Sequence, residues 1–233
     1  MPSAGCGALT TKLKNNPPGS GGSASTLNKL NVGGRDREFL VRWPSDYDKG
    51  RPYRLILGLH GHGGSWQESG LTNYGLWSLS KGSTIFVPLS AIGGNWDGAT
   101  DLTYTDEVLK LVEGELCIDT SRVMLEGFSQ GAWMASYLAC ARPGVFRGAA
   151  HSGSYDGTCS PVAFLGSVGL TDLPGMSQTS ETDPFAKTNG CTVEVPPKAS
   201  PSPGVPSMAA TTSSPRTLER PTSARRATGN AAA

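Results

Sequence analysis

Residues 122–134 read RVMLEGFSQGAWM, and this stretch decides the fold that we expect. An apolar run ends at Gly127, a serine follows at position 129, and a helical pattern begins around Gly131. A serine between two glycines at a strand-to-helix junction is typical of a nucleophile elbow, where small residues let strand and helix approach closely. The sequence therefore predicts a catalytic nucleophile at Ser129, with Gly127 and Gly131 shaping its turn.

A serine of this kind needs two N–H donors to stabilise a tetrahedral oxyanion. The helix after Ser129 would direct its N-terminal N–H groups at that oxyanion, so the backbone N–H of Gln130 is one expected donor. The second normally comes from the loop after an earlier strand. Residues 60–64, HGHGG, suit that role because their glycines leave room for the backbone to approach. We expect the second donor there, at His62.

Outward from the elbow, predicted strands and helices alternate. Four apolar runs predict strands: 37–43, 53–59, 83–90 and 122–128. The first should be antiparallel with a solvated side, and the other three should be buried on both faces. Two further short strands are expected within 146–154 and 161–169.

Helices are expected between these strands. The sequence predicts a short helix within 66–81, a longer one from an N-cap at Asp101 to Cys117, and a third over 130–141. The alternation predicts an α/β protein with a mostly parallel sheet. Ligands bind at the carboxyl ends of such strands, where the HGHGG and GFSQG stretches both lie.

Composition divides the chain into three parts. Residues 1–33 are rich in Gly, Pro, Ser and Asn and predict an irregular lead-in, residues 34–193 hold the α/β pattern, and 194–233 form a Pro/Ser/Ala-rich tail that should be disordered. Residues 1–194 carry 15 basic and 18 acidic side chains. A mildly acidic body gives no electrostatic reason to expect nucleic acid as a partner.

The cysteines and the apolar stretches bear on whether the chain binds a metal, forms disulfides or crosses a membrane. The five cysteines form no CxxC pair, which argues against a metal site: Cys6, Cys117, Cys140, Cys159 and Cys191. Two disulfides with one orphan, or five thiols, both remain open. No stretch is apolar enough to cross a membrane, and we expect a monomer that needs no cofactor.

Asp172 is the expected acid of a catalytic triad. It follows the run PVAFLGSVG, at the end of a strand after the nucleophile strand. Nucleophile, acid and then histidine is the chain order of α/β-hydrolases, and the acid would orient the imidazole. Asp172 could equally be a solvated turn residue.

These stretches together resemble the fungal feruloyl esterases related to polyhydroxybutyrate depolymerases and acetylxylan esterases. The resemblance covers roughly residues 4–193 and is carried by GCG (5–7), PSDYDKGRPYRLILGLHGHGG (44–64), LCIDTSRVMLEGFSQGAWM (116–134), LACARPGVFRG (138–148), PVAFLG (161–166) and NGCT (189–192). It implies an α/β-hydrolase fold and an extracellular enzyme that cleaves hydroxycinnamoyl groups from plant cell-wall arabinoxylan. It matches Ser129 to the nucleophile, Asp172 to the acid and residues 60–64 to the oxyanion loop.

The chain departs from the family in three places. Val168-Gly169 stands where the family has His-Gly, the secretion signal is absent, and the tail replaces the family's last strand with its catalytic histidine. The sheet is therefore expected to be incomplete at its C-terminal edge. The tail reads like coding sequence in a wrong frame or through an intron, and the competing interpretation is a genuine tail on a protein that lost its activity.

The base is the missing part of the predicted triad. The histidines are His60, His62 and His151, and none follows Asp172. The first two lie in the oxyanion loop, where the backbone is the useful part, and the third precedes the acid strand. We therefore expect a feruloyl esterase whose activity is impaired. The rivals are acetylxylan or polyhydroxyalkanoate esters as substrates, and an inactive polysaccharide-binding homologue whose Trp66 and Trp96 stack on sugars.

Overall fold

The computed structural model describes residues 1–17, 26–153 and 163–167. The chain divides into two units, Met1–Val195 and Pro196–Ala233, and all described residues lie in the first. The tail for which the sequence predicts disorder lies outside the described residues.

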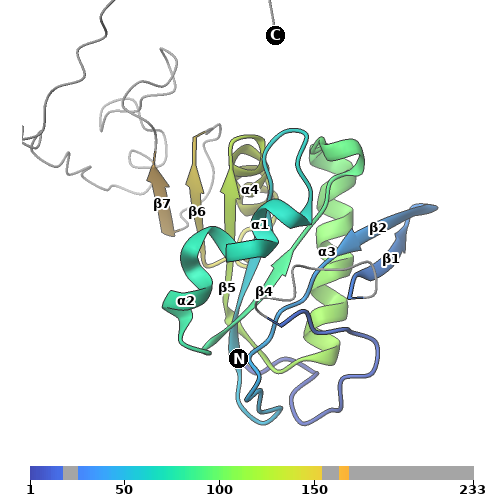
Figure 1. Ribbon diagram of the computed structural model, residues 1–233, viewed down its shortest axis with the longest axis vertical. Helices are drawn as coiled ribbons and strands as arrows, with labels where there is room; N and C mark the ends of the chain where they lie inside the picture. Colours follow the sequence, from blue (N-terminus) through green and yellow to red (C-terminus); the bar gives the residue numbers. More distant parts are fainter. Residues whose placement is uncertain (18–25, 154–162, 168–233) are drawn as a thin grey trace, which may run out of the picture. The chain divides into compact units, whose positions relative to one another are not determined.

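A parallel sheet runs through the middle of this unit (Figure 1). Within the described residues its strands pair in the order β4-β3-β5-β6-β7, and every pairing is parallel. Their bounds are β3 (Tyr53–Leu59), β4 (Thr84–Pro88), β5 (Ile118–Phe128), β6 (Gly148–Ser152) and β7 (Ala163–Ser167). The predicted α/β class with a mostly parallel sheet is confirmed.

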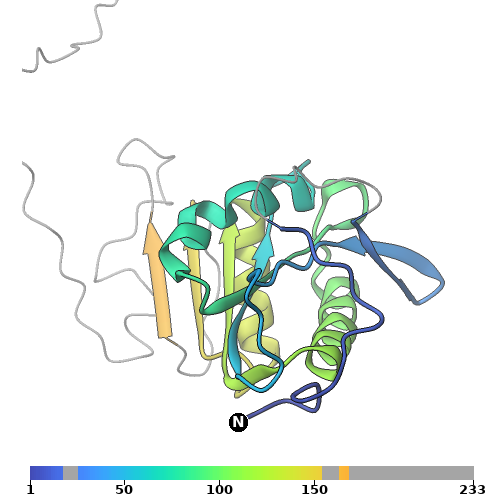
Figure 2. The same cartoon turned by 60° about the horizontal axis from the view of Figure 1, so that its bottom comes forward.

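Helices cover both faces of the sheet (Figures 1 and 2). On one face lie α1 (Trp66–Thr72) and α2 (Leu76–Ser80), and on the other α3 (Gly98–Glu115) and α4 (Gln130–Ala141). The chain passes from β3 through α1 to β4, and from β5 through α4 to β6, so it leaves the neighbouring strands β3 and β5 in opposite directions. In open α/β sheets a crevice at such a point is the usual place for a ligand.

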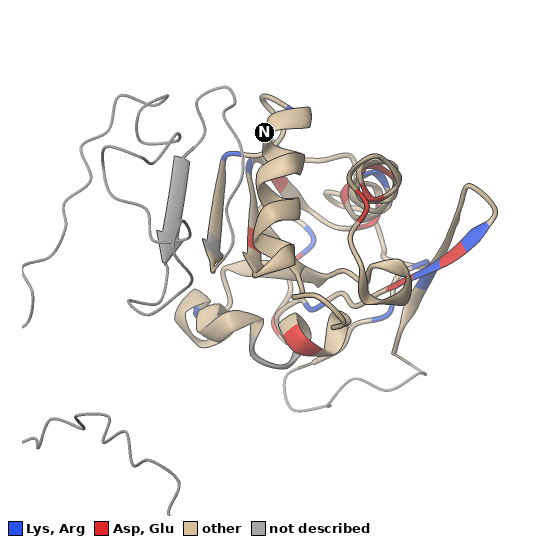
Figure 3. Cartoon of the chain, turned by 90° about the horizontal axis from the view of Figure 1, so that it is seen from above, with Lys and Arg blue, Asp and Glu red and all other residues tan. Residues whose placement is uncertain are grey.

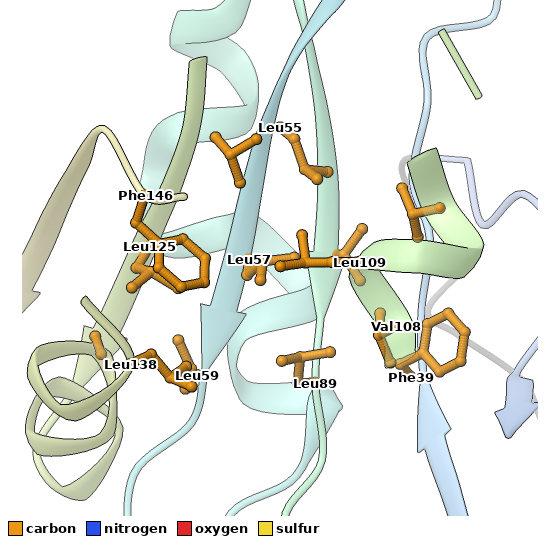
Figure 4. Packing of buried hydrophobic residues seen from close by; sticks show 14 of the residues in the cluster. Phe39, Leu55, Leu57, Leu59, Leu89, Val108, Leu109, Leu125, Leu138 and Phe146 are labelled. Atoms are coloured by element: carbon orange, nitrogen blue, oxygen red, sulfur yellow. The ribbon is translucent and has the colours of Figure 1, made fainter. Parts of the chain in front are cut away.

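The main core lies between the sheet and helices α3 and α4 (Figure 4). Leu55, Leu57 and Leu59 of β3 are fully buried and lie in one cluster with Leu109 of α3 and Leu138 of α4. Burial of each such side chain stabilises the fold by about 1.5–3 kcal/mol. On the other face of β3, Arg54 and Ile56 are only half-buried, so this strand is not covered on both faces along its whole length.

A hairpin precedes the main sheet. β1 (Asn28–Val32) pairs antiparallel with β2 (Arg35–Phe39), so a strand lies within the 1–33 segment for which an irregular conformation was expected. The chain after β2 then bridges β4 in the antiparallel sense at Arg42 and Phe86.

The predicted antiparallel strand over 37–43 is therefore present in part, but the predicted solvated side is wrong. Leu40 and Arg42 are as buried as Phe39 and Val41. Leu40 packs with Leu27 and Trp66, which cover the side that we expected water to cover.

The start of α3 also differs from its prediction. The N-cap is Asp97, whose side chain accepts the Thr100 N–H at 2.9 Å. Asp101 lies one turn later and is buried, because its carboxylate pairs with Arg37 and accepts the Asp97 N–H at 2.7 Å. The sequence could not show Arg37, which is 64 residues away, taking the carboxylate that we assigned to capping.

All three cysteines among the described residues are disulfide-bonded. Cys6 pairs with Cys117 across 111 residues, and Cys140 is disulfide-bonded to a partner outside the described residues. Of the two alternatives for the cysteines, the structure therefore favours the one with two disulfides.

Charge is scattered over this unit. Figure 3 shows short positive and negative segments among long uncharged stretches. Among the described residues, none of the helices combines the length and apolar character that a membrane span requires.

Candidate active site

The turn between β5 and α4 has a strained serine at its tip. Ser129 has φ 51° and ψ −119°, a region that a residue with a Cβ rarely occupies. Its N–H donates to the Ser152 carbonyl at 2.8 Å, which holds the turn against the neighbouring strand β6. The residue is half-buried, and its hydroxyl has no hydrogen-bond partner within the described residues. Strain of this size persists only where the surrounding structure imposes it, commonly at active sites.

The two flanking glycines make this turn sterically possible. A Cβ at Gly127 would lie 2.4 Å from the Gly131 carbonyl oxygen, and one at Gly131 would lie 2.2 Å from the Leu59 carbonyl oxygen. Both distances are far inside van der Waals contact. Strand, turn and helix can therefore pack this closely only with hydrogen atoms at these two positions.

The contact at Gly131 also joins the elbow to the loop after β3. The parallel pairing sets Leu59 opposite Gly127, so residues 60–64 leave the sheet beside the Ser129 turn. The sequence predicted that these segments share one edge of the sheet, and the structure brings them together.

The sequence singled out two backbone N–H groups at this edge, and neither has an acceptor among the described residues. One belongs to Gln130, the first residue of α4, where the helix itself offers no acceptor. The other belongs to His62. Its loop neighbours differ, because Gly61, Gly63 and Gly64 donate to Glu68, Gly94 and Gly61 respectively. The N–H of Gly131, the next residue of α4, likewise has no acceptor among the described residues, and the donor role of Gln130 and His62 stays a prediction.

His60 is part of the frame of this loop. Its Nδ1 lies 2.7 Å from the Gly61 carbonyl oxygen and its Nε2 accepts the Ala91 N–H at 3.0 Å. The ring is fully buried against Trp96, whose indole N–H donates to the His60 carbonyl at 2.8 Å. Burial lowers the pKa of His60, so the ring is neutral. With both nitrogens engaged, this histidine cannot take a proton from Ser129.

Of the remaining predicted site residues, the structure describes His62 but not Asp172 or the side chain of His151. His62 is exposed and its side chain contacts no other residue by a hydrogen bond within the described part of the chain. Asp172 lies outside the described residues, and so does the side chain of His151.

A buried carboxyl group lies below the elbow on β5. Glu126 is 2% exposed, and neither of its oxygens has a hydrogen-bond partner in the described part of the chain. Ser69 Oγ and Asn73 Nδ2, from α1 and its C-terminal end, are likewise buried and without a partner there. Burial raises the pKa of Glu126 well above its usual range, and the Asn73 side chain opposes this rise. This buried carboxyl group was not predicted, because 122–128 was expected to be an apolar strand.

Other residues of the site were also missed. Glu68, Gly94 and Trp96 all hold the loop 60–64, but each lies 7 to 36 residues after the loop residue that it contacts, with no motif that links them. The idea that Trp66 and Trp96 stack on sugars is wrong, since their exposed fractions are 8% and 5%. Both rings instead pack inside the fold.

No group of three or more His, Cys, Asp or Glu side chains that could hold a metal ion occurs among the residues that the structure describes. Within the described residues, the candidate site consists of a serine hydroxyl and backbone N–H groups.

A solved structure and several curated proteins are similar to this chain, although no family model matches it. The crystal structure of a thermostable esterase superposes with a TM-score of 0.59 at 14% identity, and the match covers 70% of this chain and 51% of that one. This chain therefore spans about half of that esterase, and the likeness shows the α/β fold alone.

The curated relatives are closer in sequence. The probable feruloyl esterase C of Aspergillus niger is 35% identical over 200 residues, which are 79% of this chain and 73% of that protein. The feruloyl esterase C of Emericella nidulans is 34% identical over 201 residues, and the feruloyl esterase D of Neurospora crassa is 34% identical over 211 residues, or 69% of its length. By this similarity, and with the elbow in place, the chain belongs to the fungal feruloyl esterases.

Proposed function

We propose that this chain is a secreted serine carboxylic-ester hydrolase that releases ferulic acid from feruloylated arabinoxylan in plant cell walls. The observation that carries the proposal is the strained turn at Ser129, whose hydroxyl is unpartnered within the described residues and lies beside the loop 60–64. The names of the relatives support ferulic acid as the acid that is released, and the geometry of the turn supports serine ester hydrolysis as the reaction type.

In the proposed reaction, Ser129 Oγ attacks the ester carbonyl and loses its proton. The N–H groups of Gln130 and His62 stabilise the oxyanion that forms, and removal of one such donor typically costs about 10²–10³ in kcat. The tetrahedral intermediate then expels the sugar hydroxyl, which takes up a proton, and leaves a feruloyl ester on Ser129. Water hydrolyses this acyl-enzyme and releases ferulate.

The proton of Ser129 needs a base. Asp172 is proposed as the acid that would orient a catalytic histidine. His60 is not that histidine, because both of its ring nitrogens are engaged. The sequence shows no histidine after Asp172, so we expect Ser129 to be a weak nucleophile and turnover to lie far below that of a complete triad.

Methyl ferulate hydrolysis by the purified chain tests the proposal. We expect ferulate release above that of the matched variant Ser129→Ala, and a lower rate on acetylated xylan and on hydroxybutyrate oligomers. A higher rate on either of those esters would move the assignment to the rival substrate.

Equal rates for the wild type and Ser129→Ala, together with retention on insoluble xylan, would instead support a polysaccharide-binding protein. The structure lends that alternative no support at Trp66 and Trp96, because both rings are buried.

A further inference from the structure

The loop 60–64 has its shape fixed by three backbone donors. The Gly63 N–H donates to the Gly94 carbonyl at 2.8 Å, and the Gly64 N–H donates to the Gly61 carbonyl at 3.0 Å. The Gly61 N–H donates to Glu68 Oε1 at 3.0 Å. Of these three acceptors, only Glu68 is a side chain. A single substitution can therefore remove one of the three without changing the loop itself.

The glycines of the loop lie against this carboxylate. A Cβ at Gly64 would come within 2.5 Å of Glu68 Oε2, and a Cβ at Gly61 within 3.4 Å of Oε1. Both ends of the turn that carries His62 therefore touch the same side chain. Loss of that side chain would leave the turn without its contact on this side.

Glu68 is itself held in place although it is exposed. It lies in the first turn of α1, where its N–H donates to the Ser65 carbonyl at 3.0 Å. The Tyr74 hydroxyl lies 3.2 Å from Glu68 Oε1 and 3.1 Å from the Leu59 carbonyl oxygen. Burial and the Glu68 charge raise the pKa of Tyr74, so its hydroxyl stays protonated and remains a donor.

We propose that Glu68 is a positioning residue for oxyanion stabilisation: its carboxylate holds Gly61 and the turn after it so that the His62 N–H faces the Ser129 edge with no partner of its own. The role in catalysis rests on the function proposed above, whereas the role in holding the loop does not. An acceptor oxygen, rather than the charge, is what the Gly61 N–H requires.

Three variants test this role. Glu68→Ala removes the acceptor, Glu68→Gln keeps an acceptor oxygen without the charge, and Tyr74→Phe removes the hydroxyl that holds Glu68. Glu107→Ala is the matched control, because Glu107 is an exposed helical glutamate whose carboxylate lies 3.9 Å from Lys110 in α3.

Two measurements are made on each variant: kcat and KM for methyl ferulate, and amide hydrogen exchange of peptides over 60–64 by mass spectrometry. For Glu68→Ala we expect kcat to fall about 10–100-fold with KM within about twofold, since a misplaced donor weakens transition-state binding only. Exchange in the loop should rise about tenfold. Glu68→Gln should stay within about threefold of the wild type in kcat and in loop exchange. Tyr74→Phe should give values between those of Glu68→Gln and Glu68→Ala. Glu107→Ala should leave both kcat and loop exchange unchanged.

The outcomes separate this proposal from the proposed function. Unchanged loop exchange in Glu68→Ala would overturn it, as would a rise in KM alone or a Glu68→Gln variant as impaired as Glu68→Ala. If the wild type releases no ferulate, the proposed function fails, but the exchange data still decide whether Glu68 holds the loop. If Glu68→Ala does not fold, Tyr74→Phe is compared with Glu68→Gln. Faster loop exchange in Tyr74→Phe than in Glu68→Gln supports the proposal, and equal exchange in the two variants overturns it.

Discussion

The two ends of the parallel sheet differ in how their backbone is satisfied. At the end where β3 and β5 begin, the backbone groups of Cys117 and Ile118 all find partners, although Arg54 Nε is buried without one among the described residues. The Ile118 carbonyl accepts the Ser3 N–H at 2.8 Å, and the Ile118 N–H donates to Ser3 Oγ at 2.9 Å. At Cys117 the N–H donates to the Tyr47 hydroxyl and the carbonyl accepts the Tyr53 N–H. The Cys6–Cys117 disulfide adds a covalent link there.

At the end where the same strands finish, the backbone is strained at one residue, and some backbone N–H groups have no acceptor among the described residues. Ser129 has a positive φ, and the N–H groups of His62 and Gln130 have no acceptor among the described residues. Such features cost stability, so the rest of the fold must hold them. The comparison shows a hydrogen-bonded frame at one end and a strained edge at the other, and the following changes test this difference in order of expected effect.

Gly131→Ala should have the largest effect, because its new Cβ would lie 2.2 Å from the Leu59 carbonyl oxygen, with no flexible side chain to give way. We expect loss of more than about 3 kcal/mol of stability, at or above the usual range for overpacking, and no ferulate release. Urea unfolding and the methyl ferulate assay measure both. A variant with wild-type stability would show that the elbow is looser than the structure indicates.

Loss of the Cys6–Cys117 disulfide should weaken only the end of the sheet where β3 and β5 begin, and it should leave the Ser129 edge unchanged. The cross-link closes a loop of 111 residues, and its removal in Cys6→Ser/Cys117→Ser should destabilise the fold by about 2–5 kcal/mol. Thermal unfolding should shift downward by roughly 10 °C. The rate of the folded fraction should stay the same, and a rate that falls with intact folding would contradict the division into frame and edge.

Glu126→Gln should remove a pH dependence of stability. Because burial raises the pKa of Glu126 in the folded state, the folded protein binds more protons than the unfolded chain between the unfolded value of about 4.3 and the raised one. The stability due to this group is therefore present at low pH and lost as pH rises through that window, by up to about 1.4 kcal/mol per pH unit.

Urea unfolding of both proteins from pH 4.5 to 9 measures this slope. The glutamine variant keeps the size of the side chain, so the difference between the two curves isolates the carboxyl group. Parallel curves would mean that the Glu126 carboxyl is solvated in the folded state.

Gly114→Ala should have the smallest effect and the opposite sign. Gly114 lies in α3, and a Cβ there meets nothing within 4 Å. Alanine is favoured over glycine in a helix by roughly 0.5–1 kcal/mol, so the variant should be slightly more stable with unchanged activity. The same unfolding assay checks it, and a loss of stability would show a contact at Gly114 that the structure lacks.

Sequence patterns located the strands and the elbow because these depend on neighbouring residues. The bounds of β3 and α4 agree with their predicted ranges, since an apolar run and a helical repeat are both local signals. The prediction failed at Asp101, where Arg37 takes the carboxylate, and at Leu40, which Trp66 covers. In each case the partner lies more than 20 residues away.

The sequence by itself determined the α/β class and the position of the tight serine turn beside the loop 60–64, because glycine and serine spacing around a strand end leaves few other conformations. Only the tertiary structure decided that His60 belongs to the frame, that Glu68 meets the Gly61 N–H and that Glu126 is buried without a partner in the described part of the chain. Those roles depend on distances between separate segments, which packing sets and which no local pattern records.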